Sequence, residues 1–203
     1  MIVIYAKSDD TPESEITAIV EAADSWGSDD LGVDKEKARY WLVKAAESNP
    51  KAMVSLALKY CVGKRTDEAL ALCNKAGDMS CGQTKVEADR LTAQIYGDVS
   101  FAGCDPEKQK AYLLKALNVK LVPTDNGFDD EYAQAASLLR AWFQERNTNS
   151  PSESNVKNAA YCAVIAAVLD RDYADRLSEF AIRQSEFDAW AVDARNYNFH
   201  LPC

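Results

Sequence analysis

Apolar residues recur along this chain at the spacing of an amphipathic helix, and one such pattern occurs three times. The three copies span residues 34–45, 65–76 and 105–116, and each ends in a Lys-Ala pair. Aligned on that pair, their mostly apolar positions fall at i, i+3, i+4 and i+7, which is one face of a helix. The aligned columns are Ala38, Ala69 and Gln109; Trp41, Leu72 and Tyr112; Leu42, Cys73 and Leu113; and Ala45, Ala76 and Ala116. Because such a helix buries its apolar face only against neighbours, the pattern predicts a solenoid of stacked helices.

Capping residues, prolines and glycines indicate where these three helices, and the helices between them, begin and end. Asn49-Pro50 breaks the first copy, Gly63 ends the helix that follows, and Asp105-Pro106 joins a capping residue to a proline at the first helical position. Residues 77–82 and 147–154 are predicted to be a turn and a flexible polar loop. The expected helices span about residues 12–26, 34–48, 50–62, 67–76, 84–96, 106–119, 129–146, 156–169 and 172–187.

This succession of helices predicts an all-α fold, an α-α superhelix that forms a single helical-repeat domain over residues 1–203. The expected repeats span about residues 12–48, 50–77 and 83–119, followed by a degenerate repeat over 128–169 and a C-terminal cap over 170–203. An aromatic tail with Trp190, Tyr197 and Phe199 is expected to cover the last apolar face.

The three copies resemble the Sel1-like repeat, a relative of the tetratricopeptide repeat. The matching residues are Gly32-Val33, Asp34, Ala38, Trp41 and Lys44-Ala45-Ala46 in the first copy; Leu56, Tyr60, Ala69 and Lys75-Ala76 in the second; and Tyr96, Gly103, Asp105 and Lys115-Ala116 in the third. The Lys-Ala pairs lie 31 and then 40 residues apart, whereas tetratricopeptide repeats keep close to 34. The chain departs from the family at Leu56, which Ala57 follows in place of glycine.

The resemblance implies antiparallel helix pairs in a right-handed superhelix that binds proteins and has no catalytic activity. The form we expect is a bacterial periplasmic or secreted inhibitor, such as an immunity protein that neutralises a toxin or effector. One alternative is a cytosolic scaffold or regulatory adaptor. A second is a cysteine-rich repeat enzyme of the β-lactam-binding type, for which the chain offers no serine-lysine motif.

Six cysteines without a Cys-x-x-Cys pair, and a single histidine, make a metal site unexpected. Disulfides in an oxidising compartment and buried thiols both remain open, because Cys73 falls in the column of Leu42 and Leu113. Secreted cysteine-rich relatives carry cysteines eight residues apart, so the resemblance implies a Cys73–Cys81 bridge. The other hypothetical pairs are Cys61–Cys104 and Cys162–Cys203.

The net charge of −9 disfavours nucleic acid and anionic membranes as partners. It is compatible with a basic protein partner, for example a toxin or effector, and equally with acidic faces that only confer solubility. No segment approaches the roughly 18 to 20 apolar residues that cross a bilayer. Residues 1–6 are too short for an intact signal peptide, so we expect a cytosolic protein or a mature secreted form with an added methionine.

Candidate catalytic groups are sparse. His200 lies three residues from the end of the chain, and no Gly-rich phosphate loop, Gly-x-Ser-x-Gly or His-Glu-x-x-His motif occurs. Paired acids such as Asp67-Glu68 begin helices, where they complement the helix dipole. We therefore expect no catalytic residues and no cofactor.

Five aromatic residues fall in predicted turns or in the tail. They are either anchors of a protein interface or plugs at the ends of helices. These residues are Trp26, Phe101, Phe128, Trp190 and Phe199.

Overall fold

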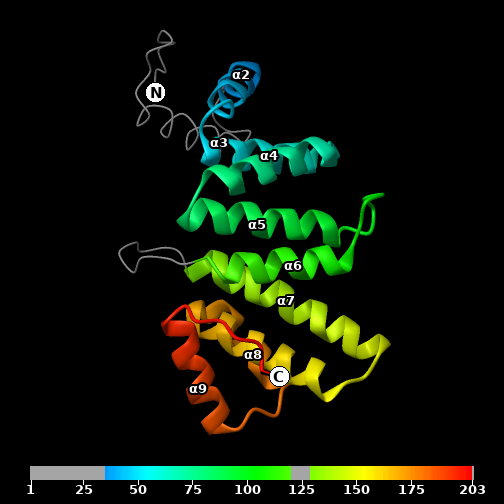
Figure 1. The fold of residues 1–203 in the computed structure, drawn as a ribbon, viewed down its shortest axis with the longest axis vertical. Coiled ribbons are helices and arrows are strands. Elements are labelled where there is room, and N and C mark those ends of the chain that lie inside the picture. The colour runs from blue at the N-terminus through cyan, green and yellow to red at the C-terminus, as the bar shows by residue number, and fades with distance from the viewer. Residues whose placement is uncertain (1–34, 120–128, 203) are drawn as a thin grey trace. The chain divides into compact units, whose positions relative to one another are not determined.

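A computed structural model describes residues 35–119 and 129–202 of the chain. Every regular element in these ranges is a helix (Figure 1), which confirms the predicted all-α class. The chain divides into two compact units, unit 1 (Met1–Met79) and unit 2 (Ser80–Cys203). No helix in the described ranges is long and apolar enough to cross a membrane. The predicted helix over 12–26 and the joint over 121–127 lie outside the described residues.

Unit 1 contains α2 (Lys35–Ala45), α3 (Pro50–Val62) and α4 (Thr66–Met79). The bounds predicted for α3 are confirmed. The Asn49 side chain accepts hydrogen bonds from the backbone N–H groups of Lys51 (2.9 Å) and Ala52 (3.2 Å), which caps the helix at its proline. Helix α3 packs against both α2 and α4. The side chains buried between α3 and α4 are mostly small: Ala52, Met53, Leu56, Ala57, Ala69, Cys73 and Ala76.

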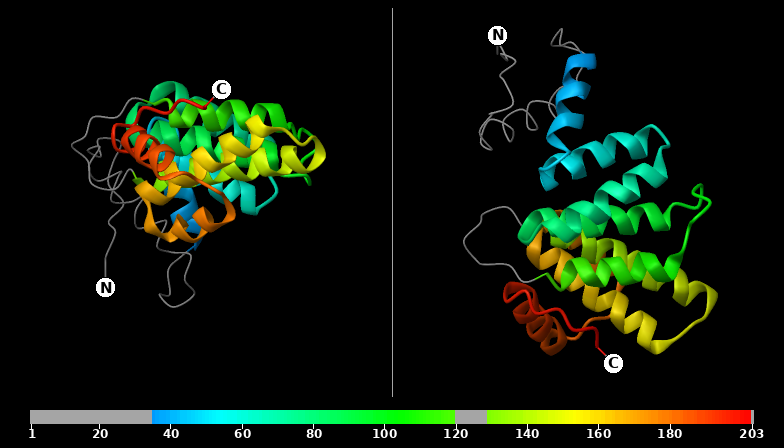
Figure 2. Two further views of the ribbon diagram at one scale, coloured as in Figure 1. Left: turned by 90° about the horizontal axis from the view of Figure 1, so that it is seen from below. Right: turned by 45° about the horizontal axis from the view of Figure 1, so that its top comes forward.

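Unit 2 contains four α-helices, a 3₁₀ helix and a last α-helix. They are α5 (Gly82–Gly97), α6 (Pro106–Leu117), α7 (Asp129–Asn149), α8 (Glu153–Leu169), the 3₁₀ helix η2 (Arg171–Glu179) and α9 (Gln184–Arg195). Neighbours in sequence pack together from α5 to α8, and both η2 and α9 cover α8 (Figure 2). Helix α8 is buried on most sides, because every residue from Asn158 to Ala166 is buried.

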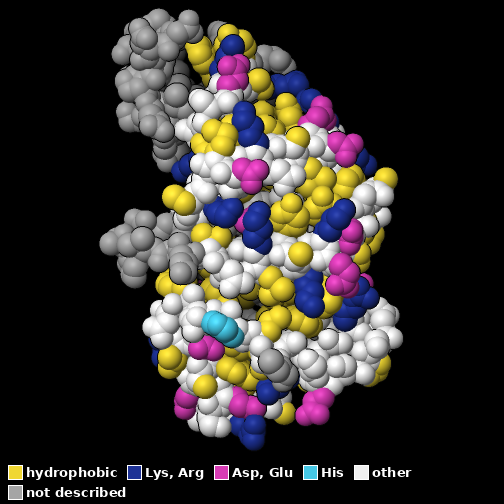
Figure 3. Space-filling model, in the orientation of Figure 1, with side chains coloured by type: hydrophobic (Ala, Val, Ile, Leu, Met, Phe, Trp, Pro, Cys, Tyr) yellow, Lys and Arg dark blue, Asp and Glu magenta, His cyan; other side chains and the backbone are white. Residues whose placement is uncertain are grey.

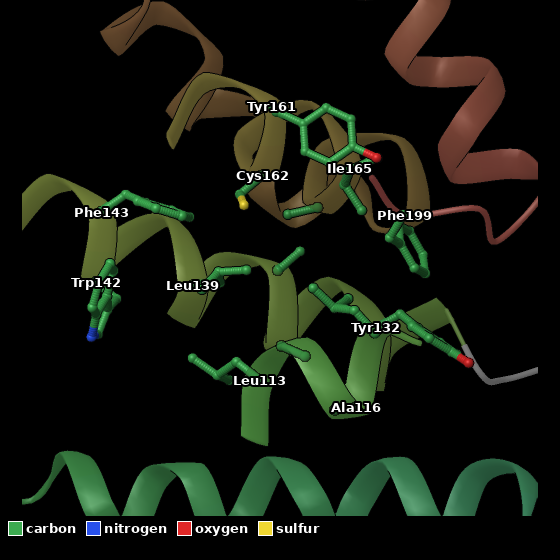
Figure 4. Close-up of a cluster of buried hydrophobic side chains, with 14 of the residues drawn as sticks. Leu113, Ala116, Tyr132, Leu139, Trp142, Phe143, Tyr161, Cys162, Ile165 and Phe199 are labelled. Carbon is green, nitrogen blue, oxygen red and sulfur yellow. The ribbon is translucent and has the colours of Figure 1, made fainter. Parts of the chain in front are cut away.

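The core of unit 2 is built around aromatic side chains of α7 (Figure 4). The buried residues of α7 follow the helical period and form its inner face: Tyr132, Ala135, Ala136, Leu139, Trp142 and Phe143. They pack with Leu113 and Ala116 of α6 and with Tyr161, Cys162 and Ile165 of α8. Each large apolar side chain buried in this way contributes about 1.5–3 kcal/mol.

Three of the four aligned columns of the Lys-Ala helices have matching burial. In the remaining column, Ala69 is buried and Gln109 is half-buried. Leu42, Cys73 and Leu113 are buried, as are Ala45, Ala76 and Ala116. Trp41, Leu72 and Tyr112 are half-buried in all three helices. The lysine of each pair has a different contact: Lys44 pairs with Glu47, Lys75 donates to the Glu47 carbonyl, and Lys115 pairs with Asp89. The apolar columns therefore have equivalent environments, while the lysines do not.

Three predicted boundaries are wrong. Helix α4 does not stop at Ala76 but continues through Gly77 to Met79. Gly77 is buried, and this burial offsets the low helix propensity of glycine. Helix α7 extends to Asn149, which shortens the predicted loop 147–154 to residues 150–152. The predicted helix 172–187 is two elements, η2 and α9.

The break between η2 and α9 follows from composition and capping. Five of the nine residues of η2 are charged and none is fully buried, so apolar burial contributes little to holding an α-helix there. Helix α9 starts afresh after Arg183, whose backbone N–H donates to the Glu186 carboxylate (3.3 Å). The predicted covering role of the tail is confirmed within unit 2: Phe199 is buried, and the His200 N–H donates to the Tyr161 hydroxyl (2.9 Å).

Candidate functional site

The predicted interface anchors that can be placed pack against the chain itself. The Trp190 ring meets Tyr161 edge-on at 5.6 Å, and the Phe199 ring lies 5.4 Å from that of Tyr132. Phe101 is half-buried against Gly103, where an added Cβ would lie 2.6 Å from its ring. These contacts favour the packing role over the anchor role. Trp26 and Phe128 lie outside the described residues.

No disulfide joins the described cysteines in this structure. Each of the predicted Cys73–Cys81 and Cys61–Cys104 bridges would join a residue of unit 1 to a residue of unit 2. Both bridges stay predictions.

The third predicted pair cannot be placed, because Cys203 lies outside the described residues. Its partner Cys162 is a thiol buried in α8, at an apolar position of the core. Burial raises the pKa of this thiol, since the thiolate would lie among apolar side chains. Cys162 therefore acts as a core residue.

One cavity lies inside unit 2, under the C-terminal tail. Its volume is about 10 Å³, close to the least space that holds a single water molecule. Its walls include Leu114, Leu139, Ile165 and Phe199. Small-molecule sites usually measure about 300–1,000 Å³. Exposed His200 is outside this lining, so the cavity and the histidine do not form a common site.

The densest group of aromatic and cationic contacts surrounds α6. The helix begins at a proline capped by Asp105, whose carboxylate accepts hydrogen bonds from the N–H groups of Glu107 (3.0 Å) and Lys108 (3.1 Å). These bonds, with the nearby Lys108 ammonium, hold the pKa of Asp105 below its ordinary value. Helical spacing then places Lys108, Tyr112 and Lys115 along the side of α6 that faces α5.

On the α5 side, two tyrosine rings stack and two lysines lie over them. The Tyr96 and Tyr112 centroids are 5.8 Å apart with their planes at 23°. Lys108 Nζ is 5.1 Å from the Tyr96 centroid, and Lys115 Nζ is 5.1 Å from that of Tyr112. Lys115 Nζ is also 2.8 Å from the buried Asp89 carboxylate. These contacts tie α5 to α6 and leave the lysines partly exposed.

On the α7 side, two cationic side chains lie over the indole ring of Trp142. The Trp142 Nε1–H donates to the Pro106 carbonyl (2.7 Å), which fixes the ring against the start of α6. Lys110 Nζ lies 4.7 Å from the Trp142 centroid, and Arg146 Cζ lies 5.1 Å from it. Arg146 also forms an ion pair with Glu107.

We call this set of residues the α6 surface. Its members are Tyr96, Lys108, Lys110, Tyr112, Lys115, Trp142 and Arg146. Figure 3 shows Lys and Arg side chains among hydrophobic ones over α5 and α6. The exposed Ala111 lies between the two flanking rows of α6, so the middle of this surface is open to an approaching chain.

Sequence analysis assigned no functional role to Lys108, Lys110 or Arg146. One signal was available, because Lys108 and Lys110 lie in the first two turns of a helix, where positive charge opposes the macrodipole. The contacts of Trp142 had no such signal, since it meets Pro106 from 36 residues away.

Comparisons of this chain with models of protein families, with curated proteins and with solved structures find no match.

Proposed function

We propose that this chain is a non-catalytic protein-binding protein and that the α6 surface is its contact area. The observation that carries the proposal is the row of aromatic rings on α5, α6 and α7 with cations stacked on them. Trp, Tyr and Arg are the residues that most often dominate binding energy at protein interfaces. Held on packed helices, they lose little freedom when a partner binds.

The matching burial of the three Lys-Ala helices supports the same role. Sel1-like helix pairs would place equivalent apolar columns inside and leave their other faces for a partner. Repeat proteins of this type bind along extended surfaces rather than in closed pockets.

The specific form that we propose is an inhibitor that occludes a toxin or effector in the bacterial periplasm or outside the cell. A cytosolic scaffold or adaptor is the second candidate. In that form the cysteines would stay reduced, because thiols persist in reducing compartments. Both forms use the same protein-binding surface.

A steric variant tests the contact area. Ala111→Trp adds a large ring at an exposed position in the middle of the α6 surface, whereas Ala189→Trp adds the same ring at an exposed position of α9. The full chain and both variants, matched for thermal unfolding, are immobilised and exposed to lysate of the source organism. The expected result is a stoichiometric partner that the wild type and Ala189→Trp retain and that Ala111→Trp loses at least tenfold.

Equal retention by Ala111→Trp and Ala189→Trp would show that partners contact another surface. The absence of any stoichiometric partner for the wild type would count against protein binding itself. Neither outcome depends on the charge of the α6 surface, because both variants exchange neutral side chains.

A further inference from the structure

The Trp142 ring is the point of the α6 surface where positive charge is most concentrated. Lys110 Nζ approaches it at 4.7 Å and Arg146 Cζ at 5.1 Å. Lys110 Nζ also lies 5.4 Å from the centroid of Phe143. We call Lys110, Trp142 and Arg146 the Trp142 node. A cation over an indole face is attracted by the ring, but two cations on one ring also repel each other.

Carboxylates compensate this charge only in part. Glu107 pairs with Arg146. Lys110 has its ring contacts but forms no ion pair with any residue in the ranges 35–119 and 129–202. The next cation, Lys108, pairs with Asp105 at 3.7 Å, yet that carboxylate already caps α6. The Trp142 node therefore holds two cations for one carboxylate in a chain whose net charge is −9.

The position of the node on α6 adds to the local positive potential. Pro106 begins the helix, so Lys110 lies in its second turn, near the positive end of the macrodipole. The Trp142 indole N–H is held by the Pro106 carbonyl, which keeps the ring beside this helix end. An additional carboxylate would be stabilised here by Lys110, by Arg146 and by the helix dipole together.

We propose that the Trp142 node binds a carboxylate side chain of an acidic segment of the partner protein. This inference rests on the protein-binding function proposed above and names the chemistry of the partner. Lys110 supplies a point charge and Arg146 supplies donors with carboxylate geometry. The buried Trp142 ring holds both cations in place. Glu107 occupies part of the site in the free protein and is displaced from Arg146 when the partner binds.

An acidic protein segment fits this surface better than a polyanion does. A free anion would contact Lys110 and Arg146 alone, which is too few groups to bind it well. A nucleic acid would bring many phosphates close to a chain with a net charge of −9. A segment with a few carboxylates meets the local cations at contact, because salt screens charges more than about 8 Å away. The local positive charge of the α6 surface therefore favours an acidic partner, whereas the net charge of −9 by itself suggests a basic one.

The test measures binding of a fluorescein-labelled peptide with Glu on one face of a helix, and of a control peptide with Gln at the same positions. The full chain is titrated at low salt, and binding is followed by fluorescence anisotropy. We expect Lys110→Ala and Arg146→Ala each to weaken binding of the Glu peptide by about fivefold, and Glu107→Gln to strengthen it by about threefold. Lys157→Ala on α8 is the matched control and should leave affinity unchanged.

The sign of the Glu107→Gln effect decides between a binding site and a structural contact. If the Arg146–Glu107 pair only held α6 against α7, its loss would weaken binding or leave it unchanged, and the proposal would fail. Equal affinity for the Glu and Gln peptides would overturn it as well. Circular dichroism checks the fold of each variant, and Lys110→Arg, which keeps the charge, should retain wild-type affinity if Lys110→Ala does not fold.

The outcomes separate this inference from the protein-binding proposal. A partner that Ala111→Trp loses, but that binds Glu107→Gln and Lys110→Ala as well as the wild type, would leave protein binding in place and overturn the carboxylate site. Glu-specific peptide binding without any retained partner would support the site and count against the wider function.

Discussion

In unit 1 the buried side chains are mostly alanine with a few larger residues, whereas the core of unit 2 is built around tyrosine, tryptophan and phenylalanine. More large apolar residues are exposed in the described part of unit 1 than in that of unit 2. In the described part of unit 1 the large exposed apolar residues are Tyr40, Val43, Leu58, Val62 and Met79, while in the described part of unit 2 they are Val99, Val156 and Val192. The described helices of unit 2 therefore bury larger apolar side chains, and we expect them to be more stable than α3 and α4.

Within unit 2, aromatic residues have two different roles, one in the core and one at the surface. The core rings Tyr132 and Tyr161 are buried, and burial raises the pKa of both hydroxyls. The rings of Tyr96 and Tyr112 are half-buried and carry lysines instead. Apolar packing holds unit 2 together from inside, and the cation-covered rings form its candidate contact surface.

The largest effect should come from the core of unit 2. Leu139→Ala removes a fully buried side chain of α7 and should lower the free energy of unfolding by about 3–5 kcal/mol, through lost transfer energy and the cavity left behind. Urea unfolding gives the loss, and hydrogen exchange of α7 and α8 peptides locates it. The matched control is Val156→Ala, an exposed position of α8 that should change stability by less than about 0.5 kcal/mol. A loss below about 1 kcal/mol for Leu139→Ala would mean that the core of unit 2 repacks freely.

The core of unit 1 should respond less. Met53→Ala in α3 also removes a fully buried side chain, but flexible methionine among small neighbours should cost about 2–3 kcal/mol. Hydrogen exchange of α3 and α4 peptides should rise, with exchange of α7 and α8 unchanged. Leu58→Ala, at an exposed position of the same helix, is the control. If Met53→Ala raised exchange in unit 2 to the same extent, the units would unfold as one body.

Each unit carries a buried thiol that reports its opening directly. Cys73 in α4 and Cys162 in α8 are both about 1% exposed. Under native conditions a thiol reagent should label Cys73 at least about tenfold faster, which corresponds to about 1.4 kcal/mol less opening energy in unit 1. Mass spectrometry of peptides over time measures the two rates, and exposed Cys81 serves as the control. Faster labelling of Cys162 would reverse the comparison.

Helix caps should matter equally in the two units, because capping is local. Asn49→Ala in unit 1 and Asp105→Ala in unit 2 each remove a side chain that accepts two backbone hydrogen bonds. Both should cost about 1 kcal/mol in urea unfolding. Asn49→Asp and Asp105→Asn keep a capping group and should retain most of the stability. A large difference between the two alanine variants would show that one cap also serves tertiary packing.

The smallest expected effect is on acid stability. Hydrogen bonds from Arg65 lower the pKa of Glu68 in unit 1, and those from Arg183 lower that of Glu186 to about 2 in unit 2. Gln144 and Arg176 lower the pKa of Glu179, also in unit 2. Since these folded pKa values lie below the ordinary value of 4.5, the pairs stabilise the protein above about pH 4.5 and lose that contribution as pH falls toward 2.

Acid should therefore weaken unit 2 at more sites than unit 1. Urea unfolding between about pH 6 and pH 3 measures the trend, with Glu186→Gln as the variant whose pH dependence should be shallower. The effect should be small because these pairs are exposed. Stability that rises on acidification would contradict the prediction.

Much of the secondary structure follows from short-range signals. Asn49-Pro50 and Gly63 bound α3, and Asp105-Pro106 begins α6, because capping bonds and proline geometry involve only residues close in sequence. The inner face of α7 is equally predictable, since its buried residues follow the helical period. Gly77 was misleading, because its usual preference for turns is overridden by burial inside α4.

The sequence by itself determined an all-α protein, the start of each well-capped helix and the apolar columns that face inward, because these depend on local hydrogen bonds and on periodicity. The tertiary structure alone decided that η2 separates from α9 and that Trp142 contacts both Lys110 and Arg146. Those outcomes depend on which side chains meet across helices from distant positions, and helix packing, not spacing along the chain, sets those distances.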